Sequence, residues 1–212
     1  MLLYLLRHGE TAWNVERRIQ GVSDTPLNEV GRAQSQALIT PLQGRPFTAL
    51  YTSPLVRARQ TADVLAAALR LEVREDPRLA ELDQGELEGM NFDQIEERFN
   101  GFLDTWRTAP ADIQMPGGEN LHQLQARAWA AVEEIQAAHP EEMVIAVSHN
   151  LAISTLLCRI MEMDLNGIRR IRQHNAAINL VEHNPERGWS VLTMNAVSHL
   201  DGQLSSDLKP YL

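Results

Sequence analysis

The sequence opens with Met1-Leu2-Leu3-Tyr4-Leu5-Leu6, and Arg7-His8-Gly9-Glu10-Thr11 follows at once. A short apolar run that ends in polar, glycine-containing sequence is typical of a buried strand that ends in a loop. The run is as apolar as a signal peptide, but no basic residue precedes it and a charged residue ends it at position 7. We therefore expect residues 1–6 to form the first strand of the fold.

Outward from this strand, the chain alternates predicted strands with predicted helices. The strands are expected at 48–53, 71–74, 143–147, 177–182 and 190–194, and the main helices at 29–42, 54–69, 120–139 and 150–161. This alternation predicts an α/β fold, a three-layer sandwich in which helices cover both faces of a mostly parallel sheet. The run Met143-Val144-Ile145-Ala146-Val147 is apolar throughout, as expected of a strand buried on both faces.

No internal repeat, low-complexity tract or linker divides the sequence, so we expect a single domain over residues 1–212. The less regular segment at about 83–119 predicts a small, lid-like helical insertion over the edge of the sheet. Asn91 with Gln94, and Asn120 with Gln123, resemble capping boxes and predict the starts of two helices. The aromatic and methionine side chains of the insertion are expected to line a lid or to form its own small core; they are Phe92, Phe99, Phe102, Trp106 and Met115.

Composition and charge limit the partners. The chain has 28 acidic and 19 basic residues, a net charge of −9, which argues against nucleic acid and acidic membranes as partners. A small anionic substrate is compatible with this charge, because salt screens distant charges over about 8 Å. No apolar run is long enough to span a bilayer. The single cysteine, Cys158, has no internal disulfide partner, which suits a reducing cytoplasm.

Polar side chains follow three of the predicted strands. Arg7 and His8 follow the first, Arg57 follows the second, and His149 follows the strand at 143–147. Glu81 lies shortly beyond the strand at 71–74. Because the carboxyl ends of parallel strands meet at one edge of a sheet, we expect these side chains to lie close together.

This set of side chains suits phosphoryl transfer: guanidinium groups bind phosphate oxygens, an imidazole is a nucleophile, and a carboxyl group protonates a leaving oxygen. Each residue alone has a simpler explanation. A histidine after a strand is more often a core or capping residue, and His149 stands directly before a predicted helix. Arg57 alone is expected in solvent or in an ion pair, and Glu81 alone on the surface. Only the joint placement favours chemistry.

Five motifs sharpen this hypothesis. They are Arg7-His8-Gly9-Glu10-Thr11 with Asn14; Ser53-Pro54-Leu55 with Arg57-Ala58 and Thr61-Ala62; Leu79 and Glu81 with Gly85 and Glu88-Gly89; Gly117-Gly118-Glu119; and Ser148-His149. In this order they resemble the signature of the histidine phosphatase superfamily, the phosphoglycerate mutase-like enzymes, over nearly the whole chain. One position departs from the common pattern: Asn150 stands where a glycine often follows the second histidine. Asparagine tolerates a left-handed backbone and caps helices, so we expect the change to be tolerated.

The resemblance implies a role for each matching residue. His8 would attack phosphorus to form a phosphohistidine, and Glu81 would protonate the leaving alcohol and then deprotonate water. It implies no metal and no other cofactor. The histidines outside the motifs show no metal-ligand spacing either. The residues that would bind the phosphate or substrate are Arg7, Asn14, Gln20, Gly21, Arg57, Glu81 and His149.

The resemblance leaves two enzymatic outcomes open, because a mutase returns the phosphoryl group to an intermediate whereas a phosphatase passes it to water. Gln20-Gly21 resembles the phosphatase branch, where mutases tend to have Thr-Gly, and the 83–119 segment is short for a cofactor-dependent mutase. We therefore expect a cytoplasmic phosphatase of a small phosphorylated metabolite, closest to the bacterial broad-specificity and α-ribazole phosphatases. The alternatives are a cofactor-dependent phosphoglycerate mutase and a non-catalytic phosphate-binding module of the same fold.

Some features stay open at this stage. The sequence does not decide the physiological substrate, or between a monomer and a homodimer. Arg17 and Arg18 are candidates for a second anionic group of the substrate, with exposure to solvent as the default. Ser198-His199 is expected near the mouth of the pocket.

Overall fold

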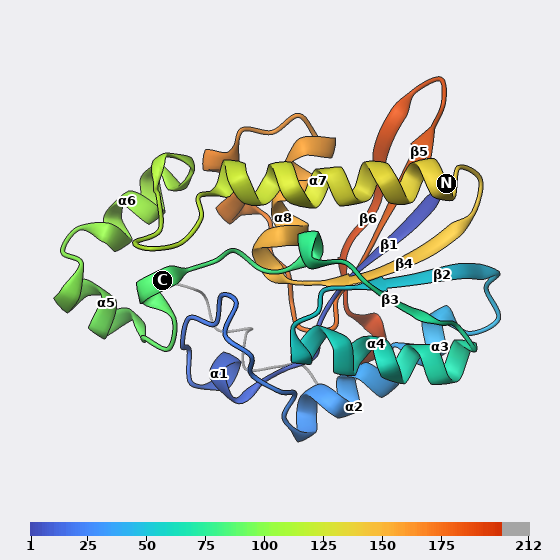
Figure 1. The fold of residues 1–212 in the computed structure, drawn as a ribbon, viewed down its shortest axis with the longest axis horizontal. Coiled ribbons are helices and arrows are strands. Elements are labelled where there is room, and N and C mark those ends of the chain that lie inside the picture. The colour runs from blue at the N-terminus through green and yellow to red at the C-terminus, as the bar shows by residue number, and fades with distance from the viewer. Residues whose placement is uncertain (201–212) are drawn as a thin grey trace.

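Six strands form one mixed sheet in the order β3-β2-β4-β1-β5-β6 (Figure 1). The structure is a computed structural model that describes residues 1–200. The first four strands in this order are parallel to one another, β5 is antiparallel to β1, and β5 and β6 form an antiparallel hairpin. The expected α/β fold with a mostly parallel sheet is confirmed. The strands are β1 (Leu2–Arg7), β2 (Phe47–Thr52), β3 (Val73–Glu75), β4 (Met143–Ser148), β5 (Ile178–Asn184) and β6 (Gly188–Ala196).

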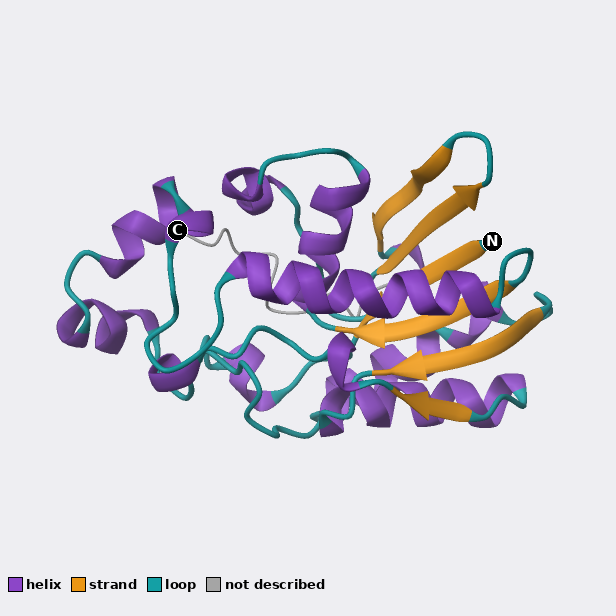
Figure 2. Cartoon of the chain, turned by 45° about the horizontal axis from the view of Figure 1, so that its top comes forward, coloured by secondary structure: helices purple, strands orange, loops and turns teal. Residues whose placement is uncertain are grey.

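Helices cover both faces of the sheet (Figures 1 and 2). On one face lie α2 (Glu29–Ala37), α3 (Ile39–Leu42) and α4 (Val56–Leu69), and on the other lie α7 (Leu121–Ala138) and α8 (Asn150–Ile160). The single helix predicted over 29–42 is wrong, because the chain forms two helices that meet at Leu38. Pro41 explains the break: proline has no N–H to donate to the carbonyl four residues earlier, at Ala37.

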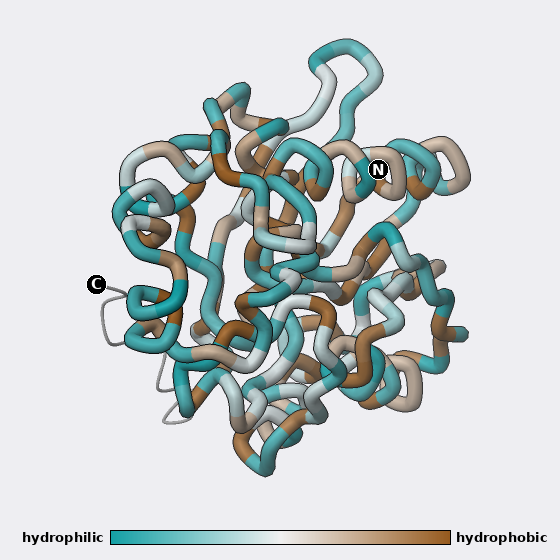
Figure 3. The backbone as a smooth tube through the Cα atoms, turned by 60° about the vertical axis from the view of Figure 1, so that its left-hand side comes forward, coloured by the Kyte–Doolittle hydropathy of each residue, from teal (hydrophilic) through white to brown (hydrophobic). Residues whose placement is uncertain are grey.

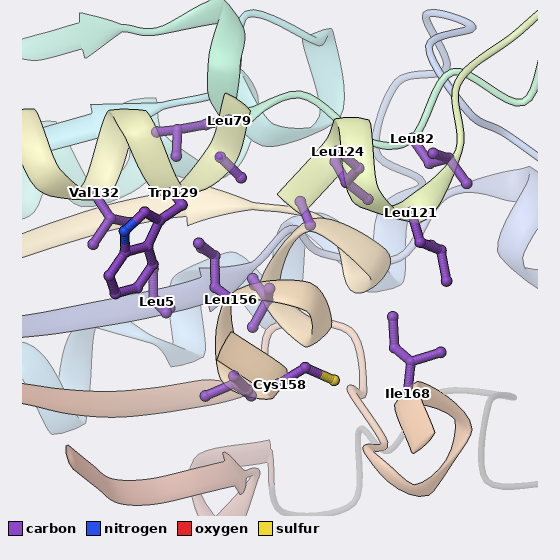
Figure 4. Packing of buried hydrophobic residues seen from close by; sticks show 14 of the residues in the cluster. Leu5, Leu79, Leu82, Leu121, Leu124, Trp129, Val132, Leu156, Cys158 and Ile168 are labelled. Atoms are coloured by element: carbon purple, nitrogen blue, oxygen red, sulfur yellow. The ribbon is translucent and has the colours of Figure 1, made fainter. Parts of the chain in front are cut away.

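Strand β1 contributes to both hydrophobic cores, as its apolar run predicts. Leu3 and Leu5 pack with side chains of α7 and α8 in one core, and Figure 4 shows Leu5 with its neighbours there. Tyr4 and Leu6 point to the opposite face and pack with α2, α3 and α4. Successive side chains of a strand point to opposite faces, so only a strand with helices on both sides buries such a run completely.

The segment between Glu81 and α7 contains the short helices α5 (Phe92–Arg98) and α6 (Phe102–Thr108). Both predicted capping boxes are present: the side chain of Asn91 accepts from Gln94 N and caps α5, and that of Asn120 accepts from Gln123 N and caps α7. Figure 2 shows α5 and α6 beyond the arrowheads of the parallel strands. The insertion therefore lies at the edge of the sheet where the polar residues follow the strands, next to the short helix α1 (Ala12–Val15).

Hydropathy changes every few residues along most of the backbone (Figure 3). Within residues 1–200, no helix combines the length and the apolar composition that crossing a bilayer requires.

The two-sided burial of β1 generates a stability prediction. Leu5→Ala should lower the free energy of unfolding by about 2–5 kcal/mol, because it leaves a cavity in a fully buried core. Urea denaturation of both proteins measures this difference. The control is Leu192→Ala on β6, where the leucine is 51% exposed, and it should change the free energy by no more than about 0.5 kcal/mol. Equal losses in the two variants would contradict this account of the core.

Candidate active site

The register of the parallel strands brings the predicted residues together. Arg7 at the end of β1 pairs with Ser148 at the end of β4, so the residues that follow, His8 and His149, are neighbours. Their ring centroids lie 5.1 Å apart. Arg57 comes from the first turn of α4, directly after β2. All of these side chains are buried, as is Glu81. The set of residues predicted from the sequence is therefore one cluster at the edge of the sheet.

The backbone sets the orientation of the His8 ring. Nδ1 of His8 lies 2.6 Å from the carbonyl oxygen of Gly9. A carbonyl only accepts, so Nδ1 carries the proton and Nε2 keeps its lone pair. Burial and the nearby charges of Arg57 and Arg7 hold the pKa of His8 well below 6.5. At neutral pH the ring is therefore an uncharged imidazole with a nucleophilic Nε2.

Two buried guanidinium groups flank this ring. Arg57 donates to the carbonyl oxygens of Gly21 at 2.6 Å and Ser23 at 2.8 Å, and it is only 1% exposed. Arg7 donates to the carbonyl oxygen of Gln173 at 2.5 Å. Burial lowers the pKa of Arg57 to about 10, although Glu81 and Asp24 oppose the shift, so Arg57 is still a cation at neutral pH. Two positive charges beside a neutral nucleophile suit a phosphate dianion.

His149 forms the third side of the cluster. Its Nε2 lies 2.7 Å from Oγ of Ser53, the residue that follows β2. Its Nδ1 and the Nε of Arg57 are buried and have no hydrogen-bond partner among residues 1–200. Burial, with the charge of Arg57 next, holds the pKa of His149 well below 6.5. Both orphaned nitrogens are donors or acceptors that a bound ligand can pair.

Glu81 reaches the start of α8. Its Oε2 accepts from the backbone N–H of Leu151 at 3.1 Å, and its Oε1 accepts from Ala152 at 3.2 Å and from Leu82 at 2.9 Å. A carboxylate at this position is favoured by the unpaired N–H groups of the first helical turn and by the helix dipole. The side chain of Glu81 is thereby held at the start of α8, the helix that follows His149.

This arrangement corrects two simpler interpretations of residues 149 and 150. His149 occupies the N-cap position of α8, but its side chain makes no capping hydrogen bond. Asn150 is the first residue of α8 and its backbone is not left-handed. It does not cap the helix, because the Glu81 carboxylate accepts hydrogen bonds from the N–H groups of the first turn. The carboxylate comes from a distant segment, so spacing along the sequence gives no sign of it.

One residue that sequence reasoning missed is Arg127 on α7. Its guanidinium donates to the carbonyl oxygens of Arg78, Ala80 and Glu81, at 2.7–2.9 Å. It also forms a two-pronged ion pair with Glu119 of the Gly117-Gly118-Glu119 motif. Arg127 is thus a positioning residue that fixes the backbone of the Glu81 segment. Glu119 belongs to one of the five motifs, so the sequence indicated it. Nothing in the sequence around Arg127 distinguishes Arg127 from other arginines on helices.

The predicted outer residues lie in α1 and in the loop that follows it. The side-chain oxygen of Asn14 accepts from Thr11 and from Asn175, and that of Gln20 accepts from the hydroxyl groups of Thr11 and Thr25. These bonds tie Gln20 to the residues on either side of it in the chain, and they tie Asn14 also to Asn175, in the segment before β5.

Gly21 takes a φ of +50°, and a Cβ there would meet the carboxylate of Glu88 at 2.0 Å. Glu88 in turn accepts from Val22 N at 2.8 Å and from the Ser23 hydroxyl. Glycine is therefore required for the turn that aims the Gly21 carbonyl at Arg57.

These residues surround a cavity of about 130 Å³. Its walls contain all of the predicted residues named above except His149, which is fully buried. They also contain Phe92 of the expected lid, and Trp13 and Leu151, which sequence reasoning did not single out. Arg17 and Arg18 line the cavity as well. The guanidinium of Arg18 donates hydrogen bonds to the Glu16 carboxylate and to the carbonyl oxygen of Gly89. Ser198 and His199 do not line the cavity, and Nε2 of His199 contacts the carbonyl oxygen of Ala176.

The described part of the chain holds no cluster of metal-ligating side chains. Across residues 1–200, no three histidine, cysteine or acidic side chains gather closely enough to hold an ion.

Comparison with known proteins agrees with this geometry. The chain belongs to the histidine phosphatase superfamily, whose branch 1 model matches residues 3–197. Probable phosphoglycerate mutase GpmB of Cronobacter sakazakii is 35% identical over 211 residues, 98% of each chain. Among solved structures, Bacillus stearothermophilus YhfR has a TM-score of 0.90 at 32% identity, over 94% of this chain and 98% of that one. The structure of a mycobacterial glucosyl-3-phosphoglycerate phosphatase with VO3 has a TM-score of 0.84 at 31% identity, over 92% of this chain and 99% of that one.

The lowered pKa values predict that His8 and His149 stay neutral in mild acid. At pH 5.5 a histidine with a pKa of about 6.5 is roughly nine-tenths protonated. Because their pKa values lie well below 6.5, both rings should keep the nitrogen chemical shifts of neutral imidazole at that pH. NMR of labelled histidines measures this, with peaks assigned from His8→Ala and His149→Ala. Imidazolium shifts for both rings at pH 5.5 would show that the cluster does not depress these pKa values.

Proposed function

We propose that this protein is a phosphomonoesterase that hydrolyses a small phosphorylated metabolite through a phosphohistidine on His8. The observation that carries the proposal is the hydrogen bond from Nδ1 of His8 to Gly9, which leaves Nε2 free between two buried arginines. The family membership of the chain and the phosphatases among its structural neighbours support the same reaction class.

In the first step, Nε2 of His8 attacks phosphorus and the bond from phosphorus to the ester oxygen breaks. The leaving oxygen takes a proton from the Glu81 carboxyl group. Oε2 of Glu81 accepts one N–H among the described residues, so this oxygen has a lone pair left to carry that proton. The products are an alcohol, a phosphohistidine and a Glu81 carboxylate.

In the second step, the Glu81 carboxylate takes a proton from water while the water oxygen bonds to phosphorus. The bond between phosphorus and Nε2 breaks, and its electron pair returns to His8. Phosphate leaves and Glu81 is again protonated, so the cycle is balanced. Throughout, Arg7, Arg57 and His149 surround the equatorial oxygens, whose charge a fixed set of donors stabilises without reorganisation. Asn14, Gln20 and Gly21 contribute by shaping the loop around the phosphate.

A phosphoglycerate mutase is the second candidate, because the relative from Cronobacter sakazakii is named a probable phosphoglycerate mutase. It would use the same phosphohistidine but return the phosphoryl group to a bound intermediate. Gln20-Gly21 and the short insertion support the phosphatase instead. A non-catalytic phosphate-binding module is disfavoured, because every residue that the chemistry needs is present.

We further propose that the reaction needs no metal and takes place in the cytoplasm, where the lone Cys158 stays reduced. Nucleic acid and membranes are not expected partners of a chain with a net charge of −9.

The nucleophile can be trapped. Brief exposure to a labelled phosphomonoester should give an acid-labile, base-stable phosphoenzyme, and His8→Ala should lose it together with turnover, by roughly a thousandfold or more. His122→Ala, on the exposed side of α7, is the control and should keep both. Normal turnover in His8→Ala would rule out the mechanism. Conversion of 3-phosphoglycerate to 2-phosphoglycerate faster than its hydrolysis would favour the mutase.

The role of Glu81 is tested by comparing substrates with good and poor leaving groups. Glu81→Gln should slow hydrolysis of alkyl phosphates by about 10²–10⁴-fold, but p-nitrophenyl phosphate much less, because only a poor leaving group needs the proton. The measurement is kcat for both substrates. Glu86→Gln, an exposed glutamate of the same segment, is the matched control and should leave both rates unchanged. Equal losses for the two substrates in Glu81→Gln would show that Glu81 is not the acid.

A further inference from the structure

The Ser53 side chain contacts the ring of His149 from the loop between β2 and α4. Ser53 is fully buried, and its hydroxyl oxygen lies 2.7 Å from Nε2 of His149. The same oxygen accepts from the backbone N–H of Leu55 at 3.3 Å. Among residues 1–200, Ser53 is the only hydrogen-bond partner of the His149 ring, because Nδ1 has none.

The local sequence explains the bond to Leu55. Pro54 has no N–H, so the N–H of Leu55 is the first one after Ser53. A serine hydroxyl that accepts from the N–H two residues later forms a common local turn. This bond uses a lone pair of the Ser53 oxygen and leaves its proton to be donated elsewhere.

The proton of the Ser53 hydroxyl has one acceptor. A hydroxyl group has a single proton to donate, and a buried donor is rarely left unpaired. The Leu55 N–H is a donor, so within the described residues the acceptor is Nε2 of His149. Nε2 must then keep its lone pair. Burial, with the charge of Arg57 next, holds the pKa of His149 well below 6.5, so the neutral ring carries its one proton on Nδ1.

The two histidines of the cluster are thus protonated in different ways. The carbonyl oxygen of Gly9 holds the Nδ1 proton of His8 and leaves a lone pair on its Nε2. The ring of His149, whose centroid lies 5.1 Å from that of His8, has a free N–H group instead. A lone pair can attack phosphorus, whereas an N–H can donate to a phosphate oxygen. The other tautomer of His149 would turn a lone pair toward the ligand and repel those oxygens.

We propose that Ser53 is a positioning residue that holds His149 as the Nδ1–H tautomer, so that Nδ1 donates to an oxygen of the phosphoryl group. The inference rests on the proposed function, which supplies the phosphoryl group. Nδ1 is buried and has no partner among residues 1–200, and an oxygen of the ligand would pair it. Ser53 itself acts only through the ring.

Nitrogen NMR of labelled histidines reads the tautomer directly. At neutral pH the wild-type spectrum should show His149 with a protonated Nδ1 and an unprotonated Nε2, with peaks assigned by their loss in His149→Ala. In Ser53→Ala, Nε2 has no donor, so the Nε2–H tautomer should become populated. A wild-type ring protonated on Nε2 would overturn the inference, however the variant folds. So would a folded Ser53→Ala that keeps only the Nδ1–H tautomer.

Binding and turnover measure what the tautomer contributes. Ser53→Ala should raise the Kd for inorganic phosphate and lower kcat/KM for p-nitrophenyl phosphate, each by roughly tenfold to a hundredfold, the usual value of a hydrogen bond to a charged group. Ser35→Ala is the matched control. Ser35 is also fully buried, but its hydroxyl donates to the carbonyl oxygen of Gly31 within α2, and its loss should change both constants less than about threefold. Circular dichroism verifies that each variant is folded.

A double variant separates positioning from general support of the fold. If Ser53 acts through the ring, Ser53→Ala should cost less than about threefold in a protein that already carries His149→Ala, because interacting residues are not additive. A loss as large as in the wild-type background would show that Ser53 does not act through His149, and would overturn the inference.

The failure of this inference differs from the failure of the proposed function. If no phosphomonoester is hydrolysed by the wild-type protein, the proposed function fails, while the tautomer and the Kd for phosphate still test Ser53. If hydrolysis depends on His8 but Ser53→Ala leaves the tautomer and the Kd unchanged, the phosphatase stands and the role of Ser53 is overturned.

Discussion

The parallel pairing of β1 and β2 with the central strand β4 is the constraint on which the site depends. It aligns the last residues of the three strands, Arg7 with Ser148 and Thr52 with Val147. Each strand therefore ends at the same level, and the residue that follows each one enters the same small space. Apolar side chains hold this register from both faces, because a slip by one residue would turn every core side chain of β1 to the wrong layer.

Burial then gives these residues their chemistry. A guanidinium in water would be paired with solvent, but Arg57 is enclosed and bonded to the carbonyl oxygens of Gly21 and Ser23. Carbonyl partners orient the cation without cancelling its charge. The same burial lowers the pKa of His8, so its ring is uncharged at neutral pH. The result is a site with two buried guanidinium groups beside a neutral imidazole, an arrangement that suits a bound anion.

The sequence predicted much of this, in places where a local pattern has one physical meaning. The apolar runs gave the strands to within a few residues, and Asn91 and Asn120 marked two helix starts by a reciprocal hydrogen-bond pattern that involves only nearby residues. The sequence did not predict contacts between distant segments. Arg127 holds three carbonyl groups some fifty residues earlier in the chain, and no spacing in the sequence reports that approach.

By itself, then, the sequence determined the α/β fold and the family, because periodicity and motif order are properties of the chain. It also predicted that His8, Arg57, Glu81 and His149 lie close together. Only the tertiary structure decided how these residues are used. It showed that Glu81 caps α8, so that Asn150 does not have that role, and that the insertion lines a second cavity that shares wall residues with the phosphate cavity. The physical reason is that burial, hydrogen-bond partners and cavity walls depend on contacts between segments that are distant in the sequence and meet only when the chain folds.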